Sequence, residues 1–258
     1  MNVLPEKPDL SGLPRLRFLT SLDFPPFNFA DENKKPTGFN IDIARGICSV
    51  LEIEQKCEIQ ALPWSELQGA LEGRRAEAII AGNEISLEAR QQFGLSAPYF
   101  RFPTRFIARK PDDASADLSD SFNDGLQGLT VAVQEGTAHE DFLKFHFPQA
   151  MAETVSSQQA GYDALQSGTV DYFLADGVSL SFYLTSPAAD GCCVFASGPY
   201  LDIDFTGLGM AVAVRNEDTF LREAITYALA VMERNGRYRE VFRRYFPLSP
   251  YAASGAGP

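Results

Sequence analysis

The sequence predicts an α/β fold made of two similar lobes. Segments with strand and helix character alternate along the chain, which is typical of α/β folds. The later segment GYDALQSGTVDYFLADG also matches the earlier LQGALEGRRAEAIIAG: each has a helix ending in Ala-Leu, a glycine, an acidic residue, an apolar strand and a polar exit. The 258 residues allow one large domain or two smaller lobes, and the repeat favours two.

The first elements of the chain are a strand, a loop and a helix. Residues 15–20, RLRFLT, predict a short strand, and prolines and glycine mark the following loop, DFPPFNFADENKKPTG. FNIDIARGICSVLEI then places apolar residues at helical spacing. SELQGALEG predicts a short helix that ends at Gly73, because glycine adopts the left-handed conformation at a helix end without steric cost. AEAIIAG predicts a buried strand.

The second half repeats this succession after an acidic, serine-rich connection, PDDASADLSDSFNDGLQG, which is expected at the surface. LTVAVQEGTAHEDFLKFHF predicts a strand, a glycine turn and a helix that opens at Thr137. Two helices are expected near the end, one closed by Asn235 and Gly236 and one formed by YREVFRRYF. The apolar face of the first consists of Phe220, Leu221, Ala224, Ile225, Ala228, Leu229 and Met232. The tail AASGAGP is expected to be disordered.

Charge and hydropathy exclude two classes of protein. A net charge of -12 and a pI near 4.6 argue against a nucleic-acid partner, since phosphate binding draws on a surplus of Lys and Arg. No apolar run approaches the roughly 18 residues that a membrane span needs. The residues after Met1 lack the apolar region of a secretion signal, but a mature secreted chain carrying a new Met would look the same. The missing signal therefore decides nothing.

The four cysteines do not form a metal site. Cys48 and Cys57 lie near each other in sequence, Cys192 and Cys193 are adjacent, and neither pair has zinc-site spacing with partner histidines. A disulfide between Cys48 and Cys57 is plausible in an oxidising compartment, and half-buried free thiols are the alternative.

Motifs for catalysis are scarce. The sequence has no G-x-S-x-G elbow, no phosphate loop and no H-E-x-x-H, and its only histidines are His139 and His146. His139, just after a helix start, could act as a general base, but a surface histidine is the favoured interpretation. A pair of carboxylates brought together from distant positions stays open, and nothing in the sequence nominates one.

Candidate binding residues gather where strands end. Phe24, Phe27, Phe29 and Trp64 lie near loops, and their rings could line a ligand. Core packing is the alternative, and it is weaker for Phe24 and Trp64, since open α/β sheets hold ligands at strand ends. EGTAHEDF ends a strand and opens a helix, whose first N–H groups attract an anion. Thr137 acting as an ordinary helix cap is the alternative there, and both roles are compatible.

Six segments, taken in order, resemble one family. They are LTSLDFPPFNFADENKKPTGFNIDIARGI, AEAIIAGNEIS, LSAPYF, VAVQEGTAHEDF, GTVDYFLADG and NGRYREVFRRYF. The series is similar to the extracytoplasmic solute-binding proteins of polar amino-acid ABC importers, family 3 type, and within them to the lysine/arginine/ornithine-binding type. The resemblance covers residues 15–248, and the ordered series is more specific than any one motif.

The resemblance implies a two-lobe periplasmic-binding-protein-like fold (type II), with a hinge and a ligand cleft between the lobes. Lobe I would comprise residues 14–103 and 205–250, lobe II residues 104–204, and residues 251–258 the disordered tail. The implied function is capture of an amino acid or amino-acid-like small molecule and delivery to the permease of an ABC importer, without chemistry, cofactor or metal. The protein is then expected to be a periplasmic monomer whose signal peptide has been removed. A disulfide between Cys48 and Cys57 falls close to one known in the comparison type.

The resemblance also assigns roles to residues. Asp176, directly after an apolar strand, would hold the ligand's ammonium, where a charged hydrogen bond is worth about 1.5–3 kcal/mol. Gly136 and Thr137 match a turn whose amides help to bind the ligand's α-carboxylate. Phe24 and Trp64 match two aromatic walls around the ligand side chain.

The strand exit at residues 82–86 would complete the lobe I side of the site. Gly82 and Ser86 match positions that supply backbone contacts, and Asn83 and Glu84 are also expected at the ligand. Glu84 is a departure, because relatives usually place a small hydroxyl residue there, near the ligand's amino group. An amino-acid derivative with a second cationic or amide group, and with Glu84 as its partner, is therefore an alternative ligand.

Two further departures concern charged groups. Many relatives carry, four residues after the match to Ile85, an arginine that clamps the carboxylate bidentately. Here Ala89 falls there and Arg90 comes one place late, which turns a helical side chain by about 100°. Either the helix start carries an extra residue that restores Arg90, or the clamp has gone. Ser21 stands where binders of basic amino acids carry a carboxylate, and Asp23 is near but shifted.

Two other functions fit the same scaffold. One is an enzyme that uses the cleft as an active site, as in the related cyclohexadienyl dehydratase. The other is the ligand-sensing domain of a receptor, which the short tail and the lack of a membrane segment disfavour.

Overall fold

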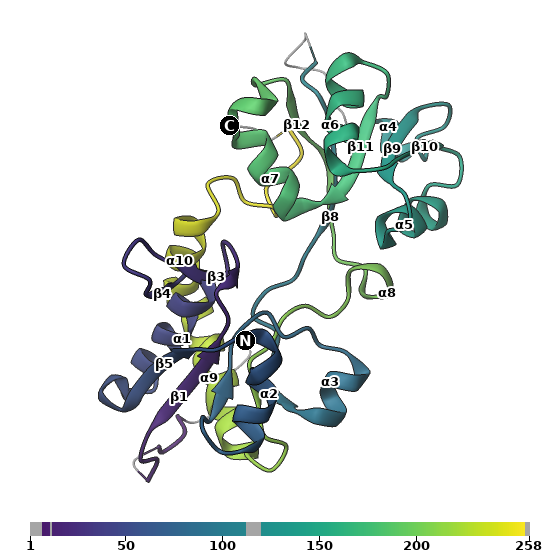
Figure 1. Cartoon of the computed structure of the whole chain (residues 1–258). Coiled ribbons are helices and arrows are strands. Elements are labelled where there is room, and N and C mark those ends of the chain that lie inside the picture. The colour runs from purple at the N-terminus through teal and green to yellow at the C-terminus, as the bar shows by residue number, and fades with distance from the viewer. Residues whose placement is uncertain (1–6, 11, 112–119, 256–258) are drawn as a thin grey trace. The chain divides into compact units, whose positions relative to one another are not determined.

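The structure is a computed structural model that describes residues 7–10, 12–111 and 120–255. Within them the chain divides into two compact units. Unit 1 contains the described residues of Met1–Arg101 together with Leu208–Tyr245, and unit 2 contains those of Phe102–Gly207 together with Phe246–Pro258. Figure 1 shows the helices and strands of each unit.

Unit 1 is built on a five-stranded mixed sheet, in the order β5, β1, β6, β13, β7. β1 runs parallel to β5 and β6, whereas β13 runs antiparallel to β6 and β7. The strands are β1 (Leu16–Thr20), β5 (Cys57–Ala61), β6 (Ala78–Ile79), β7 (Gly94–Leu95) and β13 (Ala213–Val214). A second, antiparallel sheet is formed by β2 (Asp23–Phe24), β3 (Asn28–Ala30) and β4 (Pro36–Thr37). The strand predicted at residues 15–20 is confirmed as β1.

The helices of unit 1 follow the apolar spacing of the sequence. They are α1 (Phe39–Val50), the 3-10 helix η1 (Glu54–Lys56), α2 (Trp64–Glu72), α3 (Leu87–Gln92), α9 (Thr219–Arg234) and α10 (Arg237–Tyr245). α1, α9 and α10 pack against one another, and α2 buries Leu67 and Leu71 against Leu19 and Ile79 of the sheet. The apolar face predicted for α9 is buried except at Phe220, whose side chain is exposed.

The end of α2 differs from the prediction in one detail. The helix closes at Gly73, but the φ of Gly73 is -73°, and the left-handed residue is Arg74, with a φ of 57°. The Gly73 N–H still donates to the Gly69 carbonyl (2.9 Å), so Gly73 keeps helical geometry and the reversal falls on the next residue. The corresponding helix of unit 2, α6 (Gln158–Ser167), does end at a left-handed glycine, Gly168.

Unit 2 has the same sheet topology as unit 1. Its strands lie in the order β10, β9, β11, β8, β12; the first three are parallel, β8 is antiparallel to β11, and β12 is antiparallel to β8. The strands are β8 (Thr104–Arg109), β9 (Thr130–Gln134), β10 (Met151–Val155), β11 (Tyr172–Asp176) and β12 (Cys193–Tyr200). The repeat found in the sequence corresponds to α2 with β6 and to α6 with β11, the third parallel strand of each sheet. The predicted α/β class is confirmed.

The central strand β11 explains why unit 2 is layered. Phe173 and Ala175 pack with α6 and α7 (Gly177–Thr185), whereas Tyr172 and Leu174 pack with α5 (Ala138–His146). Side chains alternate between the faces of a strand, so the four consecutive apolar or aromatic residues 172–175 need cover on both faces. The remaining helices are α4 (Asp120–Asn123), η2 (Pro187–Ala189) and α8 (Ile203–Thr206). Residues 112–119 of the expected surface connection lie outside the described residues.

Both cysteine pairs are disulfides in the structure. Cys48 of α1 is bonded to Cys57 of β5 with an S–S distance of 1.96 Å, which ties this helix to the edge strand of the unit 1 sheet. Cys192 and Cys193 are bonded to each other at the start of β12. The alternative of free thiols is therefore wrong for this structure.

A buried arginine of unit 2 holds the end of the chain. Arg105, on β8, is fully buried, and its Nη1 donates to the carbonyl oxygens of Pro250 (3.0 Å) and Ala252 (2.6 Å). Its Nε donates to the Ser197 carbonyl (2.9 Å), and the guanidinium lies over the Phe195 ring at 4.0 Å. Burial lowers the pKa of Arg105 to about 10. These contacts hold the C-terminal segment on unit 2, together with Leu248 and Ala252, which pack against the unit 2 core.

The C-terminal boundary therefore differs from the expectation. Lobe I was expected to run to residue 250 and residues 251–258 to be disordered, but unit 1 ends at Tyr245 and the chain from Phe246 belongs to unit 2. The Gly255 N–H donates to the Phe195 carbonyl (2.6 Å), so disorder is wrong for residues 251–255. Residues 256–258 lie outside the described residues. The tail consists mainly of alanine, glycine and proline, which give no sign in the sequence of a partner on β8.

Replacing Arg105 with methionine should lower the free energy of unfolding by about 2–3 kcal/mol, because three carbonyl groups lose their donor. Urea unfolding followed by circular dichroism measures the change. Arg74→Met is the matched control, since the Arg74 side chain is 67% exposed and its loss should cost less than about 0.5 kcal/mol. Equal effects of the two variants would contradict the anchoring role of Arg105.

Candidate functional site

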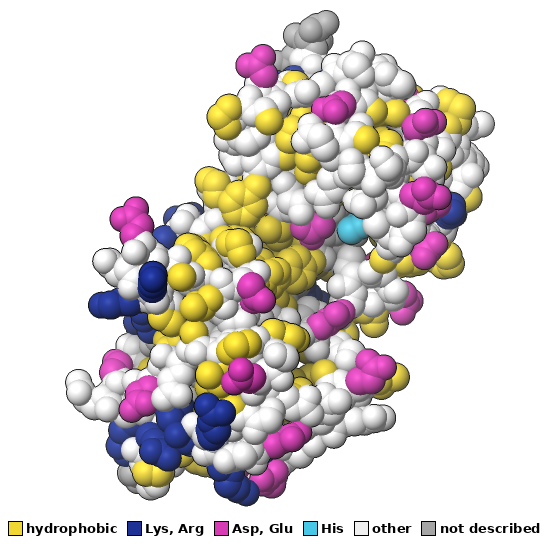
Figure 2. Space-filling view, in the orientation of Figure 1, with side chains coloured by type: hydrophobic (Ala, Val, Ile, Leu, Met, Phe, Trp, Pro, Cys, Tyr) yellow, Lys and Arg dark blue, Asp and Glu magenta, His cyan; other side chains and the backbone are white. Residues whose placement is uncertain are grey.

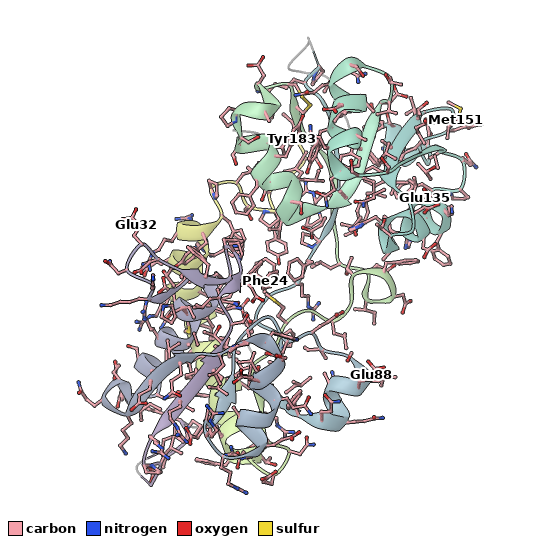
Figure 3. All side chains as sticks on the ribbon, in the orientation of Figure 1. Phe24, Glu32, Glu88, Glu135, Met151 and Tyr183 are labelled. Carbon is pink, nitrogen blue, oxygen red and sulfur yellow. A yellow bond between two sulfur atoms is a disulfide. The ribbon has the colours of Figure 1, made fainter. Side chains whose placement is uncertain are left out.

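The strand exit after β6 is closely packed beneath an aromatic ring. Gly82 has a φ of +94°, and a Cβ at this position would lie 2.8 Å from Cε1 of Phe24. Only glycine fits both the backbone conformation and the space. Phe24 in turn stacks on Phe27 with ring centroids 4.7 Å apart. The structure thus brings Phe24 and Gly82, two predicted site residues of unit 1, into contact (Phe24 is labelled in Figure 3).

A chain of buried polar side chains lies next to this strand exit. Asn28 Nδ2 donates to Ser21 Oγ (2.9 Å), Asn40 Nδ2 donates to Asn28 Oδ1 (2.7 Å), and the Tyr99 hydroxyl donates to Asn40 Oδ1 (2.9 Å). Burial raises the pKa of Tyr99, and a backbone hydrogen bond from Gly82 partly offsets the rise. The chain therefore connects β1, β3 and α1 to the glycine that lies under Phe24.

The burial of Ser21 alters its expected role. Ser21 is 2% exposed, and both its hydroxyl and its carbonyl accept hydrogen bonds from Asn28. In this structure the Ser21 hydroxyl and carbonyl are therefore both engaged by Asn28. Asp23, on β2, is exposed. Asn28 and Asn40 were not predicted as part of this network. Each is an asparagine in an otherwise apolar segment, and this pattern could have indicated a buried hydrogen bond, since a buried polar side chain needs a partner.

A pocket of about 500 Å³ lies between α2 and α3 in unit 1. Four predicted site residues line it: Trp64, Asn83, Glu84 and Ser86. Residues that the sequence analysis did not predict, among them Gln68 and Glu88, also line it, and Leu67, Ile79 and Phe93 contribute apolar surface. The structure therefore gathers the aromatic start of α2 and the strand exit around one cavity. Glu88 is labelled on α3 in Figure 3.

The start of α3 determines where Arg90 lies on this helix. Ser86 is the N-cap, and its Oγ accepts the Ala89 N–H at 3.0 Å. The helix begins at Leu87, directly after the cap, so Arg90 lies one position beyond Ala89 in its first turn. The Arg90 side chain is exposed, does not line the pocket, and forms no ion pair with any residue that the structure describes.

Asp176 ends β11 and caps α7 in unit 2. Its Oδ1 accepts both the N–H (2.9 Å) and the hydroxyl (3.2 Å) of Ser179. Burial raises the pKa of Asp176, and the bonds from Ser179 partly offset the rise. The charged form of a carboxylate that is desolvated in this way is stabilised when a cation binds beside it.

In the turn after β9, polar groups of the turn and of the first turn of α5 form hydrogen bonds with one another. Gly136 has a φ of +71°, and its N–H donates to Glu140 Oε2 at 2.7 Å, which resembles a capping box. The Thr137 hydroxyl donates to the Gln134 carbonyl at 2.7 Å and does not cap α5 through its side chain. Thr137 still occupies the cap position, but side-chain capping by Thr137 was wrong. Burial lowers the pKa of His139, which follows in the first turn.

Charge is unevenly distributed over the visible face. In Figure 2 the basic side chains gather mainly on unit 1, whereas acidic side chains occur on both units. Among the residues that the structure describes, no group of three His, Cys, Asp or Glu side chains could hold a metal ion. Within the same residues, no helix has the length and apolar character to cross a bilayer.

The chain matches known proteins over most of its length. Residues 16–248 match the family described as bacterial extracellular solute-binding proteins, family 3. ABC transporter arginine-binding protein 1 of Escherichia coli (strain K12) is 26% identical to this chain, and the match covers 92% of this chain and 93% of the relative. The lysine/arginine/ornithine-binding periplasmic protein of the same strain is also 26% identical, and the match covers 92% of this chain and 89% of the relative. A solved structure, substrate-binding domain 2 of GlnP from Lactococcus lactis in an open conformation, shares the fold, with a TM-score of 0.69, 20% identity, and coverage of 92% and 97%.

Asp176→Asn should raise the free energy of unfolding at pH 7, because asparagine keeps the cap but removes a desolvated charge. Since the folded-state pKa is raised, the folded protein binds the proton more readily, and the gain should vanish as the pH falls through that pKa. Thermal unfolding between pH 3 and pH 8 tests this, with exposed Asp163→Asn as the control. A variant less stable than the parent at pH 7 would contradict it.

Proposed function

Because the chain belongs to the bacterial extracellular solute-binding proteins of family 3, we propose that it captures an amino acid or a close analogue and delivers it to the permease of an ABC importer. The observation that carries the proposal is the family match across residues 16–248, which spans both units. The names of the two Escherichia coli relatives, which bind arginine and lysine, arginine or ornithine, support an amino-acid ligand. The protein acts by binding, without a chemical step.

The ligand's ammonium group is held by Asp176 in this proposal. The carboxylate lies at the end of β11, where burial favours a cation over water as its partner. The ligand's side chain lies between Phe24 and Trp64, whose position at a strand end and at a helix start suits that role. The exit at residues 82–86 supplies polar backbone groups beside them.

The ligand's carboxylate has two candidate partners. One is the first turn of α5, after Gly136 and Thr137, whose backbone N–H groups point along the helix axis. The other is Arg90. Its position on α3 changes the direction of approach, and its exposed side chain has no ion-pair partner among the residues that the structure describes. An exposed arginine retains the reach of a long side chain, so the register shift does not remove it from the proposal.

The remaining features of the proposal follow from the same family. The two units close on the ligand as lobes around a hinge. The protein works as a monomer in the periplasm, and the disulfide between Cys48 and Cys57 fits an oxidising compartment.

A thermal-shift screen of the purified protein with amino acids, opines, polyamines and dipeptides should give stabilisation by an amino acid or analogue. A ligand present at 100 times its Kd adds about 2.7 kcal/mol to the stability of the native state. The ligand should be recovered unchanged after incubation. Conversion of the ligand to a product would show that the protein is an enzyme and would contradict the proposed binding function. The absence of a thermal shift with every compound would contradict an amino-acid ligand.

Asp176→Asn should weaken binding of the stabilising amino acid by ten- to hundredfold, because one charged hydrogen bond to the ammonium is lost. Isothermal titration calorimetry measures the affinity, and Asp163→Asn is again the control. Unchanged affinity in a folded Asp176→Asn variant would place the ammonium elsewhere.

A further inference from the structure

Unit 2 contains a disulfide between neighbouring residues. Cys192 and Cys193 are adjacent in the chain and bonded to each other at the start of β12. Their Cα atoms are 3.7 Å apart, the separation that one peptide bond sets, whereas the Cα atoms of a disulfide usually lie about 4.4–6.8 Å apart. The Cα separation of Cys48 and Cys57, 6.3 Å, lies within that range. The two disulfides therefore differ in kind.

The bond holds two neighbouring side chains against one core cluster. Both cysteines pack with the cluster of unit 2 that contains Phe195; Cys193 is buried and Cys192 is half-buried. Neighbouring side chains of a regular strand point to opposite faces of the sheet. Cys192 precedes β12, although its carbonyl accepts the Lys110 N–H (2.6 Å) in continuation of the pairing of Cys193 with Arg109. Breaking the bond therefore allows the strand to begin one residue earlier, with the two sulfurs on opposite faces.

The disulfide of unit 1 joins parts that the fold already packs together. Cys48 lies in α1 and Cys57 begins β5, and this helix and this strand are in contact. The chain between them is also held by backbone bonds, since the Ile53 N–H donates to the Cys48 carbonyl (3.0 Å). Reduced thiols therefore stay near each other at this bond, whereas those of a reduced vicinal pair separate. Thiols held at a high effective concentration re-form their bond more readily.

Cys192 is the residue of the pair that solvent reaches more, and a tyrosine hydroxyl lies beside it. The Tyr183 hydroxyl is 3.9 Å from Cys192 Sγ and is the donor there, because a disulfide sulfur carries no hydrogen. Tyr183, labelled in Figure 3, also stacks on Tyr162 with ring centroids 3.7 Å apart. Burial raises the pKa of Tyr183, so its hydroxyl keeps the proton. A thiolate released at Cys192 therefore has a hydrogen-bond donor next to it.

We propose that the disulfide between Cys192 and Cys193 is a redox site, at which unit 2 exchanges two electrons with an external dithiol while the disulfide of unit 1 stays closed. A thiolate of the dithiol attacks Cys192 Sγ, the bond between the two Sγ atoms breaks, and Cys193 leaves as a thiolate that takes a proton from water. The second thiol of the reductant loses its proton to water, attacks the reductant's sulfur in the mixed disulfide and releases the Cys192 thiolate, which is then protonated. The protein ends with two thiols, and the dithiol ends as a disulfide.

The competing interpretation makes the vicinal bond purely structural. A disulfide stabilises a protein mainly by closing a loop in the unfolded chain, and the effect grows with the length of the loop. Cys48 and Cys57 are separated by 9 positions, whereas no residue lies between Cys192 and Cys193. Loop closure therefore contributes little at the vicinal bond. A structural bond would open no more readily than the bond of unit 1, or only when the protein unfolds.

A redox titration of the full chain separates the two interpretations, with the unit 1 disulfide as the internal control. The oxidised protein is equilibrated with mixtures of reduced and oxidised dithiothreitol, its thiols are trapped with N-ethylmaleimide, and each cysteine peptide is quantified by mass spectrometry. The bond between Cys192 and Cys193 should open at a ratio of reduced to oxidised dithiothreitol at least tenfold lower than the bond between Cys48 and Cys57, which corresponds to about 30 mV. Circular dichroism should stay that of the folded protein. Opening of both bonds at one ratio, opening of the unit 1 bond first, or opening only together with unfolding would overturn the redox site.

Two matched variants test which sulfur is attacked. Cys193→Ser leaves a single thiol at the half-buried Cys192, and Cys192→Ser leaves one at the buried Cys193. With oxidised glutathione, the thiol of folded Cys193→Ser should form a mixed disulfide at least tenfold faster than that of folded Cys192→Ser. Equal rates, or a faster reaction at Cys193, would overturn attack at Cys192. If either variant fails to fold, the titration of the parent still decides whether the redox site exists, because it needs no substitution.

Discussion

The carboxyl end of the unit 1 sheet depends on a chain of buried hydrogen bonds from Ser21 through Asn28 and Asn40 to Tyr99. Each bond contributes only about 0.5–1.5 kcal/mol net, but a buried group left without a partner costs more, so the four side chains fix one another. They join segments that are far apart in sequence: the end of β1, the hairpin, the start of α1 and the approach to β8. The candidate site can be well ordered because this network holds the backbone beside Gly82.

Several features of the candidate site oppose stability. The carboxylate of Asp176 is desolvated, Asn83 Oδ1 has no donor among the described residues, and Trp64 is left half exposed. Among the described residues, unpaired buried polar atoms also occur away from these groups, for example Thr104 Oγ1 and Arg105 Nη2. An unpaired atom therefore does not by itself identify a ligand contact.

Local patterns predicted much of the fold. Helical spacing placed α1 and α9, apolar strands placed β1 and β11, and the repeat around α2 and α6 corresponded to one topology used twice. The structure brings some of the predicted site residues together: Trp64, Asn83, Glu84 and Ser86 line one pocket, and Phe24 lies on Gly82. Their contact with a ligand stays a prediction. One failure depended on a distant partner: the order of residues 251–255 depends on Arg105. The other two depended on which nearby group a hydroxyl contacts, since Ser21 bonds to Asn28 and Thr137 bonds to Gln134. Such pairings cannot be predicted from the types of residue alone.

We propose that a bound amino acid contacts residues 82–90 and Asp176. Hydrogen–deuterium exchange with and without saturating L-arginine tests it most directly, because exchange reports on each backbone segment separately. The account predicts slower exchange at residues 82–90 and, in the same sample, at residues 176–179. Protection confined to one unit, or found in neither while L-arginine is bound, would contradict it.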